Sequence, residues 1–141
     1  MFKLRNATIE DLPNCLVCAK KFVDFYGLCW NETSVMFNLT TLINSGVFVI
    51  AEVNNVIVAG IGGITIKNMW DSEQNFFQEL FWWVDEEYRK GSLGIKLLKT
   101  LEDQTPKGAL LVLSVLPKSN IKEETLSKLG YSLKELAYIK D

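Results

Sequence analysis

The chain has 141 residues, a length that fits one domain, and 48% of them are hydrophobic, enough for a substantial core. Its net charge of −2 argues against a protein that binds nucleic acid or a membrane surface through bulk positive charge. The first residues lack the apolar run of a signal peptide, and no run approaches the ~20 apolar residues of a membrane span. We therefore expect a single cytoplasmic domain covering residues 1–141.

Three cysteines and the absence of histidine limit the chemistry. An odd number of cysteines favours a reducing compartment. The spacing of Cys15 and Cys18 is that of a redox or zinc pair, but zinc would lack its remaining ligands, so no metal is expected. We expect both thiols, unlike a catalytic cysteine, to lie on a helix as small apolar residues. Without histidine, Ser-His and Cys-His nucleophiles are excluded.

The first part of the chain predicts a strand and two helices. Residues 2–7 alternate between apolar and polar side chains, as a strand does. Thr8 and Asp11 have the spacing of a capping box, and apolar residues then recur on one helical face from about residue 9 to residue 26. A second helix follows, with either residue of Thr33-Ser34 as its cap.

The middle of the chain predicts a meander of antiparallel strands. Residues 47–53 and 56–66 are rich in valine and isoleucine, and Asn54-Asn55 between them suits a two-residue hairpin turn. Three glycines in the second of these strands indicate a bulge, or the close approach of another chain or a ligand. Residues 74–84 then form a third, long strand.

The last third predicts two more helices and a closing strand. Apolar residues recur at helical spacing over 94–101, and 109–116 are almost wholly apolar, as in a central buried strand. Asn120 can begin a fourth helix that Gly130 ends, and 131–140 close the chain as a strand pair or one bent strand. The order βααβββαβαβ(β) predicts an α/β (α+β) fold with a central mixed, mostly antiparallel sheet flanked by about four helices.

The junction after Val84 is a candidate anion site. An apolar strand ends there, an acidic turn follows, and Arg89-Lys90-Gly91-Ser92-Leu93-Gly94 leads into a helix. The N–H groups that open a helix have no partner within it, and the helix dipole places partial positive charge there. We expect a site for a small anion, best a pyrophosphate, with Arg89 as its main side-chain ligand and Lys90 beside it. The alternative is a solvated basic turn.

This order of elements resembles the GNAT superfamily, the acyl-coenzyme A-dependent N-acetyltransferases. Residues 84–94 are similar to the signature of that family, a strand ending in Val, an acidic or proline turn and Arg/Gln-x-x-Gly-x-Gly/Ala before a helix. Asn120 with Lys-Leu-Gly-Tyr at 128–131 resembles a second family motif. Two positions depart from the pattern: Ser92 stands where the family has a glycine, and Leu126 where it often has a tyrosine that protonates the leaving thiolate.

The resemblance implies direct transfer of an acetyl group from acetyl-CoA to a primary amine of a small molecule or a protein. Glu79 is the candidate base for the amine proton, and strict alternation would place it on one face with Phe81 and Trp83. The Val84 amide is the candidate oxyanion donor. The backbone of three strand residues would pair with the pantetheine arm like an added strand. The implied cofactor contacts are Trp82, Trp83, Val84, Arg89, Lys90, Gly91, Ser92, Leu93, Gly94, Ile95 and Asn120.

Each role has an ordinary alternative. Glu79 could face solvent or pair with a lysine, and Asn120 could be only a helix cap. Residues 26–30 and 67–73 offer aromatic and acidic side chains that suit a cationic amine, or are ordinary polar loops. The main alternative function is a non-catalytic acyl-CoA sensor or interaction module on the same fold. A nucleotide-binding domain is disfavoured because Gly-Lys-Ser/Thr is missing. A homodimer is possible through the edge that a closing strand leaves.

Overall fold

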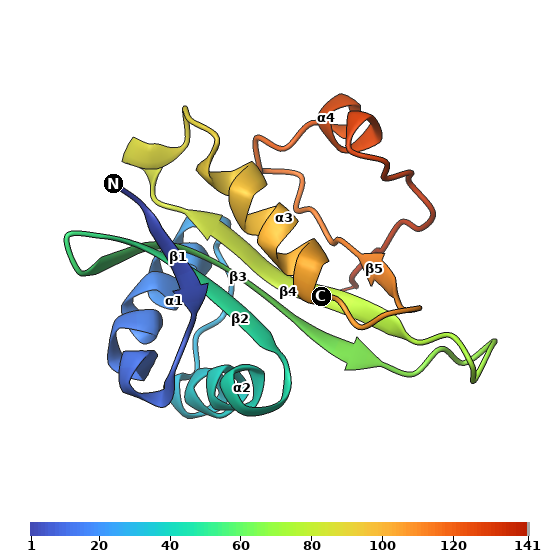
Figure 1. The fold of residues 1–141 in the computed structure, drawn as a ribbon, viewed down its shortest axis with the longest axis horizontal. Helices are drawn as coiled ribbons and strands as arrows, with labels where there is room; N and C mark the ends of the chain where they lie inside the picture. The colour runs from blue at the N-terminus through green and yellow to red at the C-terminus, as the bar shows by residue number, and fades with distance from the viewer. Residues whose placement is uncertain (141) are drawn as a thin grey trace.

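The computed structural model describes residues 1–140 and contains a five-stranded sheet with helices on both faces (Figure 1). The strands lie in sequence order; β1 to β4 are antiparallel, and β5 joins β4 in parallel across the α3 crossover. The predicted mixed, mostly antiparallel sheet with four helices is confirmed. The elements are β1 (Lys3–Asn6), a 3-10 turn (Ile9–Asp11), α1 (Leu12–Tyr26), α2 (Glu32–Ser45), β2 (Val47–Val53), β3 (Val56–Ile66), β4 (Phe76–Val84), a 3-10 turn (Glu86–Tyr88), α3 (Leu93–Gln104), β5 (Leu110–Val112) and α4 (Glu123–Lys128).

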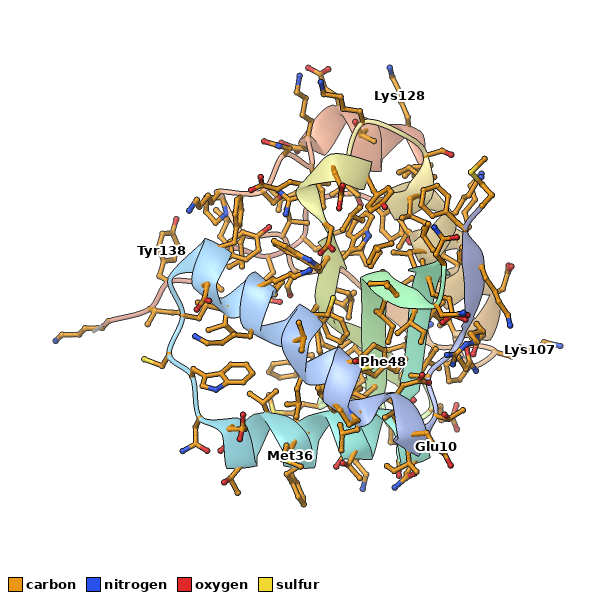
Figure 2. The ribbon with its side chains drawn as sticks, turned by 90° about the vertical axis from the view of Figure 1, so that its left-hand side faces the viewer. Glu10, Met36, Phe48, Lys107, Lys128 and Tyr138 are labelled. Atoms are coloured by element: carbon orange, nitrogen blue, oxygen red, sulfur yellow. The ribbon has the colours of Figure 1, made fainter. Side chains whose placement is uncertain are left out.

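Each face of the sheet has its own apolar core. On one face α3 packs four leucines, each at most 1% exposed, against β2, β3 and β4: Leu93, Leu97, Leu98 and Leu101. On the other face α1 and α2 cover the sheet, and Cys15 and Cys18 are buried as predicted. Figure 2 shows Phe48 between these helices and the sheet, whereas Met36 points outward from α2. The sheet therefore separates two layers of side chains that meet only at its edges.

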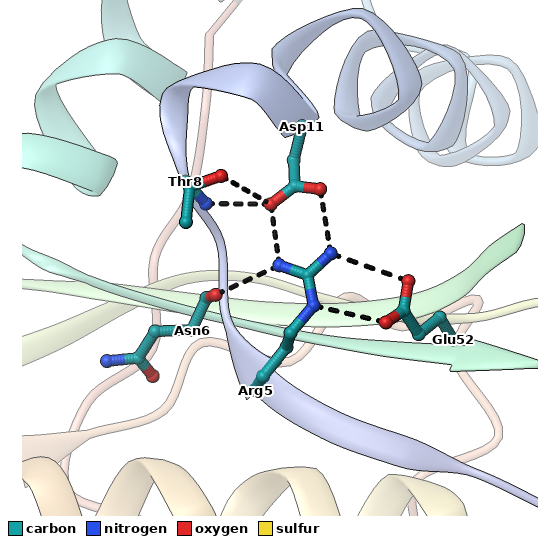
Figure 3. A network of polar contacts seen from close by, with 5 residues as sticks. All are labelled: Arg5, Asn6, Thr8, Asp11 and Glu52. Carbon is teal, nitrogen blue, oxygen red and sulfur yellow. Dashed lines mark hydrogen bonds and ion pairs between the residues drawn. The ribbon is translucent and has the colours of Figure 1, made fainter. Parts of the chain in front are cut away.

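An arginine-centred network joins the first strand to the start of the first helix. Arg5 donates to both carboxylate oxygens of Asp11, at 2.7 and 2.8 Å, and to Glu52 in β2 at 3.1 Å (Figure 3). The hydrogen bonds from Arg5 hold the pKa of Asp11 well below its usual range. Asp11 also accepts the Thr8 N–H at 2.7 Å, as the predicted capping box requires. The network thus fixes where α1 begins.

The turn of the β2–β3 hairpin is as predicted, but the cap of the second helix is not. Asn54 and Asn55 both have positive φ, 50° and 65°, which is the conformation of a type I′ turn. The second helix begins two or three residues earlier than Thr33-Ser34 suggested. Its cap is Asn31, whose side chain accepts the Ser34 N–H at 2.9 Å.

The end of the chain departs most from prediction. β5 covers only three residues of the expected strand over 109–116, and it is an edge strand rather than a buried central one. No strand forms over 131–140, where Leu133, Leu136 and Ile139 are exposed. These three apolar residues recur every third position, which does not match the two-residue alternation of a strand. The segment lies along the outside of the molecule, and Tyr138 points away from it (Figure 2).

A bulge in β4 explains two of the three glycines in β3. Gly62 pairs with Phe81 and Gly63 with Glu79, so Leu80 is an extra residue. A Cβ on Gly62 would lie 2.7 Å from the Phe81 ring, and one on Gly63 would lie 2.7 Å from the Phe77 ring. Neighbouring strand residues face opposite ways, so the two rings cover opposite faces of the sheet. The prediction that Glu79 shares a face with Phe81 is therefore wrong, because the bulge reverses the alternation between them.

We predict that Gly63→Ala destabilises the protein by about 1–3 kcal/mol, because the new methyl group must displace the buried Phe77 ring or the Gln78 carbonyl. Gly91→Ala is the matched control. No atom lies within 4 Å of the Cβ it adds, so its effect should stay within about 0.5 kcal/mol. Urea unfolding of both variants checks this, and equal midpoints would show that the packing over the bulge tolerates a side chain.

Candidate functional site

The outer edge of β4 is unpaired beyond the short contact with β5. The two strands pair only from Phe76 to Gln78, and the chain after β5 then leaves the sheet (Figure 1). The Asp85 N–H donates to the Val58 carbonyl in β3 at 2.8 Å. Because backbone groups alternate in direction along a strand, those of Val84 and Trp82 face the open edge. By the same alternation, the backbone groups of Trp83, two residues before Asp85, face β3 instead.

A cavity of about 250 Å³, here named the β4 groove, lies along this open edge. It runs between β4, the first turn of α3 and the segment that leads into α4. It is lined by Phe25, Tyr26, Trp82, Val84, Arg89, Gly91, Gly94, Ile95, Ser119, Asn120, Ile121, Lys122, Thr125 and Leu126. The fold thus brings the strand, the turn and the Asn120 segment, far apart in sequence, around one space.

Seven of the eleven predicted cofactor contacts line the groove: Trp82, Val84, Arg89, Gly91, Gly94, Ile95 and Asn120. Asn120 does not cap α4, which begins after Lys122. The other four lie elsewhere. The Trp83 and Leu93 side chains are buried in the two cores, and Lys90 and Ser92 are exposed beside the turn. Leu93 can therefore face a ligand only with its backbone.

The first turn of α3 presents backbone donors to the groove. The helix begins at Leu93, and its first bond runs from the Lys96 N–H to the Ser92 carbonyl at 3.0 Å. The N–H groups of residues 93–95 precede that bond and have no partner within the helix. A Cβ on Gly94 would lie 3.8 Å from the Trp82 ring and the Val84 side chain. The glycine therefore keeps open a space that any side chain would narrow.

Arg89 is held over aromatic rings at the edge of the groove. Its Nε donates to the Val84 carbonyl at 2.6 Å, and its guanidinium lies 4.4 Å from the Trp83 ring centroid and 4.8 Å from that of Phe25. Lys118 adds a second cation, 4.4 Å from the Phe25 centroid. The alternative of a solvated basic turn is thus not what forms at Arg89. The sequence carried no local signal for Phe25 or Lys118, because α1 brings the ring from a distant segment.

Glu79 is the one charged residue among the buried side chains of residues 1–140, at 3% exposed. It neither faces solvent nor pairs with a lysine, the two alternatives that the sequence left open. Its Oε1 accepts the Ser114 N–H at 3.0 Å, just past the end of β5. Burial raises the pKa of Glu79 to about 7, although the Ser114 N–H opposes the shift. Near neutral pH the carboxyl group can therefore both take up and release a proton.

The loops expected to recognise a cationic amine are partly satisfied by the chain itself. Lys20 pairs with Asp24 at 2.6 Å and lies 5.5 Å from the Trp30 ring centroid. Trp70 is 83% exposed and does not line the β4 groove. A tyrosine that the sequence did not single out for the groove, Tyr26, lies at the end of α1 and lines it, and burial raises its pKa.

Two kinds of feature are absent from residues 1–140. No group of three or more histidine, cysteine, aspartate or glutamate side chains is placed to hold a metal ion. None of the helices has the length and apolar character needed to cross a membrane.

Comparison with known proteins now adds to this geometry. The model of the acetyltransferase (GNAT) family matches residues 18–131. No curated protein sequence matches the chain.

Solved structures of similar fold cover nearly the whole of both chains. An acetyltransferase from Trypanosoma brucei is 19% identical with a TM-score of 0.76, over 100% of this chain and 99% of its own. A predicted acetyltransferase with acetyl-CoA from Clostridium acetobutylicum is 16% identical with a TM-score of 0.78, over 100% and 96%. Glucosamine-6-phosphate N-acetyltransferase from Arabidopsis thaliana is 17% identical with a TM-score of 0.72, over 100% and 98%. With the family model matching most of its length, the chain belongs to the GNAT family of acetyltransferases.

Proposed function

We propose that this protein is an N-acetyltransferase that transfers an acetyl group from acetyl-CoA to a primary amine by direct attack in a ternary complex. The observation that carries the proposal is Glu79, a buried carboxyl group with a pKa of about 7, at the point where β5 leaves the open edge of β4. A proton acceptor is needed there because a free alkylamine, with a pKa near ~10.4, is mostly protonated at neutral pH.

The β4 groove fits coenzyme A. The unpaired N–H groups of the α3 first turn, with Arg89 and Lys122 nearby, suit the pyrophosphate. The outward backbone of Trp82 and Val84 suits the amides of the pantetheine arm, which would add to the sheet edge. Trp83 contributes its ring as a support for Arg89 rather than its backbone. Lys90 and Ser92 would act from the rim, Leu93 through its backbone only, and Gly91, Gly94, Ile95 and Asn120 along the walls.

The chain's own residues can then carry out the transfer. When bound, acetyl-CoA supplies a thioester as the acyl donor. Glu79 takes the proton of the ammonium group, directly or through water, and the freed amine nitrogen attacks the carbonyl carbon. The new C–N bond replaces the C–S bond, whose electron pair leaves with sulfur. The Val84 N–H, which faces the open edge, would donate to the carbonyl oxygen as it gains charge.

No enzymic acid is required for the leaving group. Leu126, where the family often has a tyrosine, lines the groove with an apolar side chain. A thiol has a pKa near ~8.5, so its thiolate leaves far more readily than an alkoxide would. The proton that Glu79 accepts can pass to the thiolate or to water when the products depart.

The alternative is a domain that binds acyl-CoA without turnover. Ser92 and Leu126, the two departures from the family pattern, favour it. Both functions need the β4 groove, but only the enzyme needs Glu79 to ionise. We also propose that residues 1–141 act as one domain. Its three free cysteines suggest the cytoplasm. The short outer strand β5 offers an edge through which a homodimer could form.

We predict that Glu79→Gln lowers kcat/KM by about 10²–10⁴-fold, because the amide cannot accept the amine proton. In the wild type, kcat/KM should rise as the pH approaches about 7 and level off above it, since only the carboxylate form is active. Thiol release from acetyl-CoA, measured from pH 5.5 to 9 against a panel of amines, checks both. Glu10→Gln, at an exposed helix start, is the control. Full activity in Glu79→Gln would remove the assigned base.

The same carboxyl group should make folding stability depend on pH. Its pKa is raised on folding, so the folded state holds the proton more tightly, and stability falls as the pH rises from about 4.5 to about 7. The pH-dependent contribution of Glu79 to the free energy of unfolding is on the order of 3 kcal/mol, at about 1.4 kcal/mol per tenfold change in proton affinity. The free energy of unfolding of Glu79→Gln minus that of the wild type should therefore be larger at pH 8.5 than at pH 5. Unfolding curves at the two pH values check this; an unchanged difference would mean that Glu79 titrates normally.

We predict that Gly94→Val weakens acetyl-CoA binding by at least about tenfold, because the side chain fills the space beside Trp82 and Val84. The protein should stay folded, since the Cβ lies at ordinary contact distance from both. Isothermal titration calorimetry measures the affinity, and Thr100→Val, two turns further along α3, is the control. Wild-type affinity in Gly94→Val would place the cofactor outside the β4 groove.

A further inference from the structure

A second and larger cavity lies on the opposite face of the sheet from α3. Its volume is about 430 Å³, and it is enclosed by α1, α2 and strands β2 to β4. We name it the α1–α2 cavity. It is nearly three times the size of the ~150 Å³ apolar cavity that holds one benzene molecule, and it falls in the range of small-molecule sites.

The walls of the α1–α2 cavity are apolar. Every described residue that lines it is uncharged, and aromatic rings form one side: Phe22, Phe48, Phe81 and Trp83. Cys15 and Cys18 also line it, and burial raises the pKa of both thiols to about 12, so they stay neutral. Of its polar groups, Thr41 donates to the Phe37 carbonyl and is already satisfied. Such a space favours an apolar group and disfavours a charged one.

The cavity extends to the residue that follows the candidate base in β4. Leu80, the extra residue of the β4 bulge, lines it and is 51% exposed, and Asn38 on α2 lines it as an exposed polar residue. Leu80 directly follows Glu79, and consecutive Cα atoms are ~3.8 Å apart. The Glu79 side chain shares the α3 face with Phe77, so a linker from the cavity would have to pass around the open edge of β4, beyond the end of its ladder with β5 at Gln78, to bring an amine to the carboxyl group.

An aromatic cluster connects the lining of the cavity with that of the β4 groove. Trp83 lines the cavity, while Phe25 and Tyr26 line the groove, and Phe22 packs between them at centroid distances of 4.8 Å from Tyr26 and 6.2 Å from Trp83. Direct transfer requires both substrates at once, and the donor would fill the groove. The cavity is therefore the space left for the acceptor, approached from the other face of the sheet.

We propose that the α1–α2 cavity binds the apolar body of the acceptor, so that the acceptor is a primary amine attached by a linker to an uncharged ring or branched alkyl group. This inference rests on the proposed function and narrows it. Polyamines, amino sugars and basic peptides would each place further charges or many hydroxyl groups against apolar walls. The charged loops do not offset this, since Lys20 already pairs with Asp24 and lies over Trp30.

The first test compares three acceptors at saturating acetyl-CoA: ethylamine, 2-phenylethylamine and spermidine. We expect kcat/KM for 2-phenylethylamine to exceed that of the other two by at least about tenfold, since one additional buried apolar group already gives this much discrimination. A preference for spermidine, or equal values for ethylamine and 2-phenylethylamine, would overturn the proposal.

The second test fills the cavity. Ala19→Phe places a ring inside it, whereas Val17→Phe adds the same ring on the exposed side of α1. We expect Ala19→Phe to abolish the preference for 2-phenylethylamine but to retain turnover of ethylamine, and Val17→Phe to behave as the wild type. If Ala19→Phe does not fold, as judged by circular dichroism, Val35→Phe fills the cavity from α2, with Met36→Phe as its exposed control.

Two outcomes separate this proposal from the proposed function. Binding of 2-phenylethylamine, measured by calorimetry and abolished by Ala19→Phe, without turnover of any amine would keep the site and reject the enzyme. Turnover of amines without any effect of Ala19→Phe would keep the enzyme and reject the site. Should Ala19→Phe instead change the preference between hexanoyl-CoA and acetyl-CoA, the cavity would hold the acyl chain, and the acceptor proposal would be wrong.

Discussion

The separation of β4 from β5 depends on one hydrogen bond, from the Ser114 N–H to the Glu79 carboxylate. In a continued parallel ladder that N–H would bond to a backbone carbonyl of β4, and the two strands would stay side by side. Here a side chain takes its place, and Gln78 adds a bond from its Nε2 to the Ser114 Oγ at 3.0 Å. The ladder stops at Gln78 and Val112, the edge of β4 is left open, and a carboxyl group is buried where the opening begins. The open edge of β4 and the buried carboxyl group of Glu79 therefore both arise from this one contact.

The bulge at Leu80 determines which face of the sheet the neighbouring aromatic rings of β4 occupy. Without the extra residue, Phe77 and Phe81 would point to the same face, and one core would carry both rings. With it, Phe77 packs under α3, while Phe81 joins the aromatic residues under α1 and α2. The glycines opposite are the condition for this arrangement, since both rings occupy the space where their side chains would be. The β4 groove at the strand edge and the α1–α2 cavity on one face can therefore both lie against the same strand.

Much of the fold follows from local sequence, because its signals are local. The capping box at Thr8, the Asn54-Asn55 turn and the leucines of α3 each predicted an element that the structure contains. The failures are non-local. The length of β5 depends on whether Glu79 or a backbone carbonyl receives the Ser114 N–H, and no pattern within 109–116 encodes that. The Val84–Gly94 signature located the turn, but the rings of Phe25 and Trp83 that hold Arg89 come from another helix and the opposite face. The sequence suggested Glu79 as a base, but it did not predict the burial of the side chain or its raised pKa, since both depend on the packing around it.

The position of Arg89 couples the proposed donor site to the proposed acceptor site. Its guanidinium rests on the Trp83 ring, and the other side of the molecule uses that same ring as a wall of the α1–α2 cavity. Its Nε also holds the carbonyl of Val84. A ligand that shifts the Trp83 ring from the cavity side must therefore change the position of the Arg89 guanidinium on the groove side. Thermodynamic linkage makes such an effect reciprocal, so whatever occupancy of the cavity does to the affinity of the groove, occupancy of the groove does equally to the cavity. Trp83, which contributes no reacting atom, would then set the degree of cooperativity between donor and acceptor.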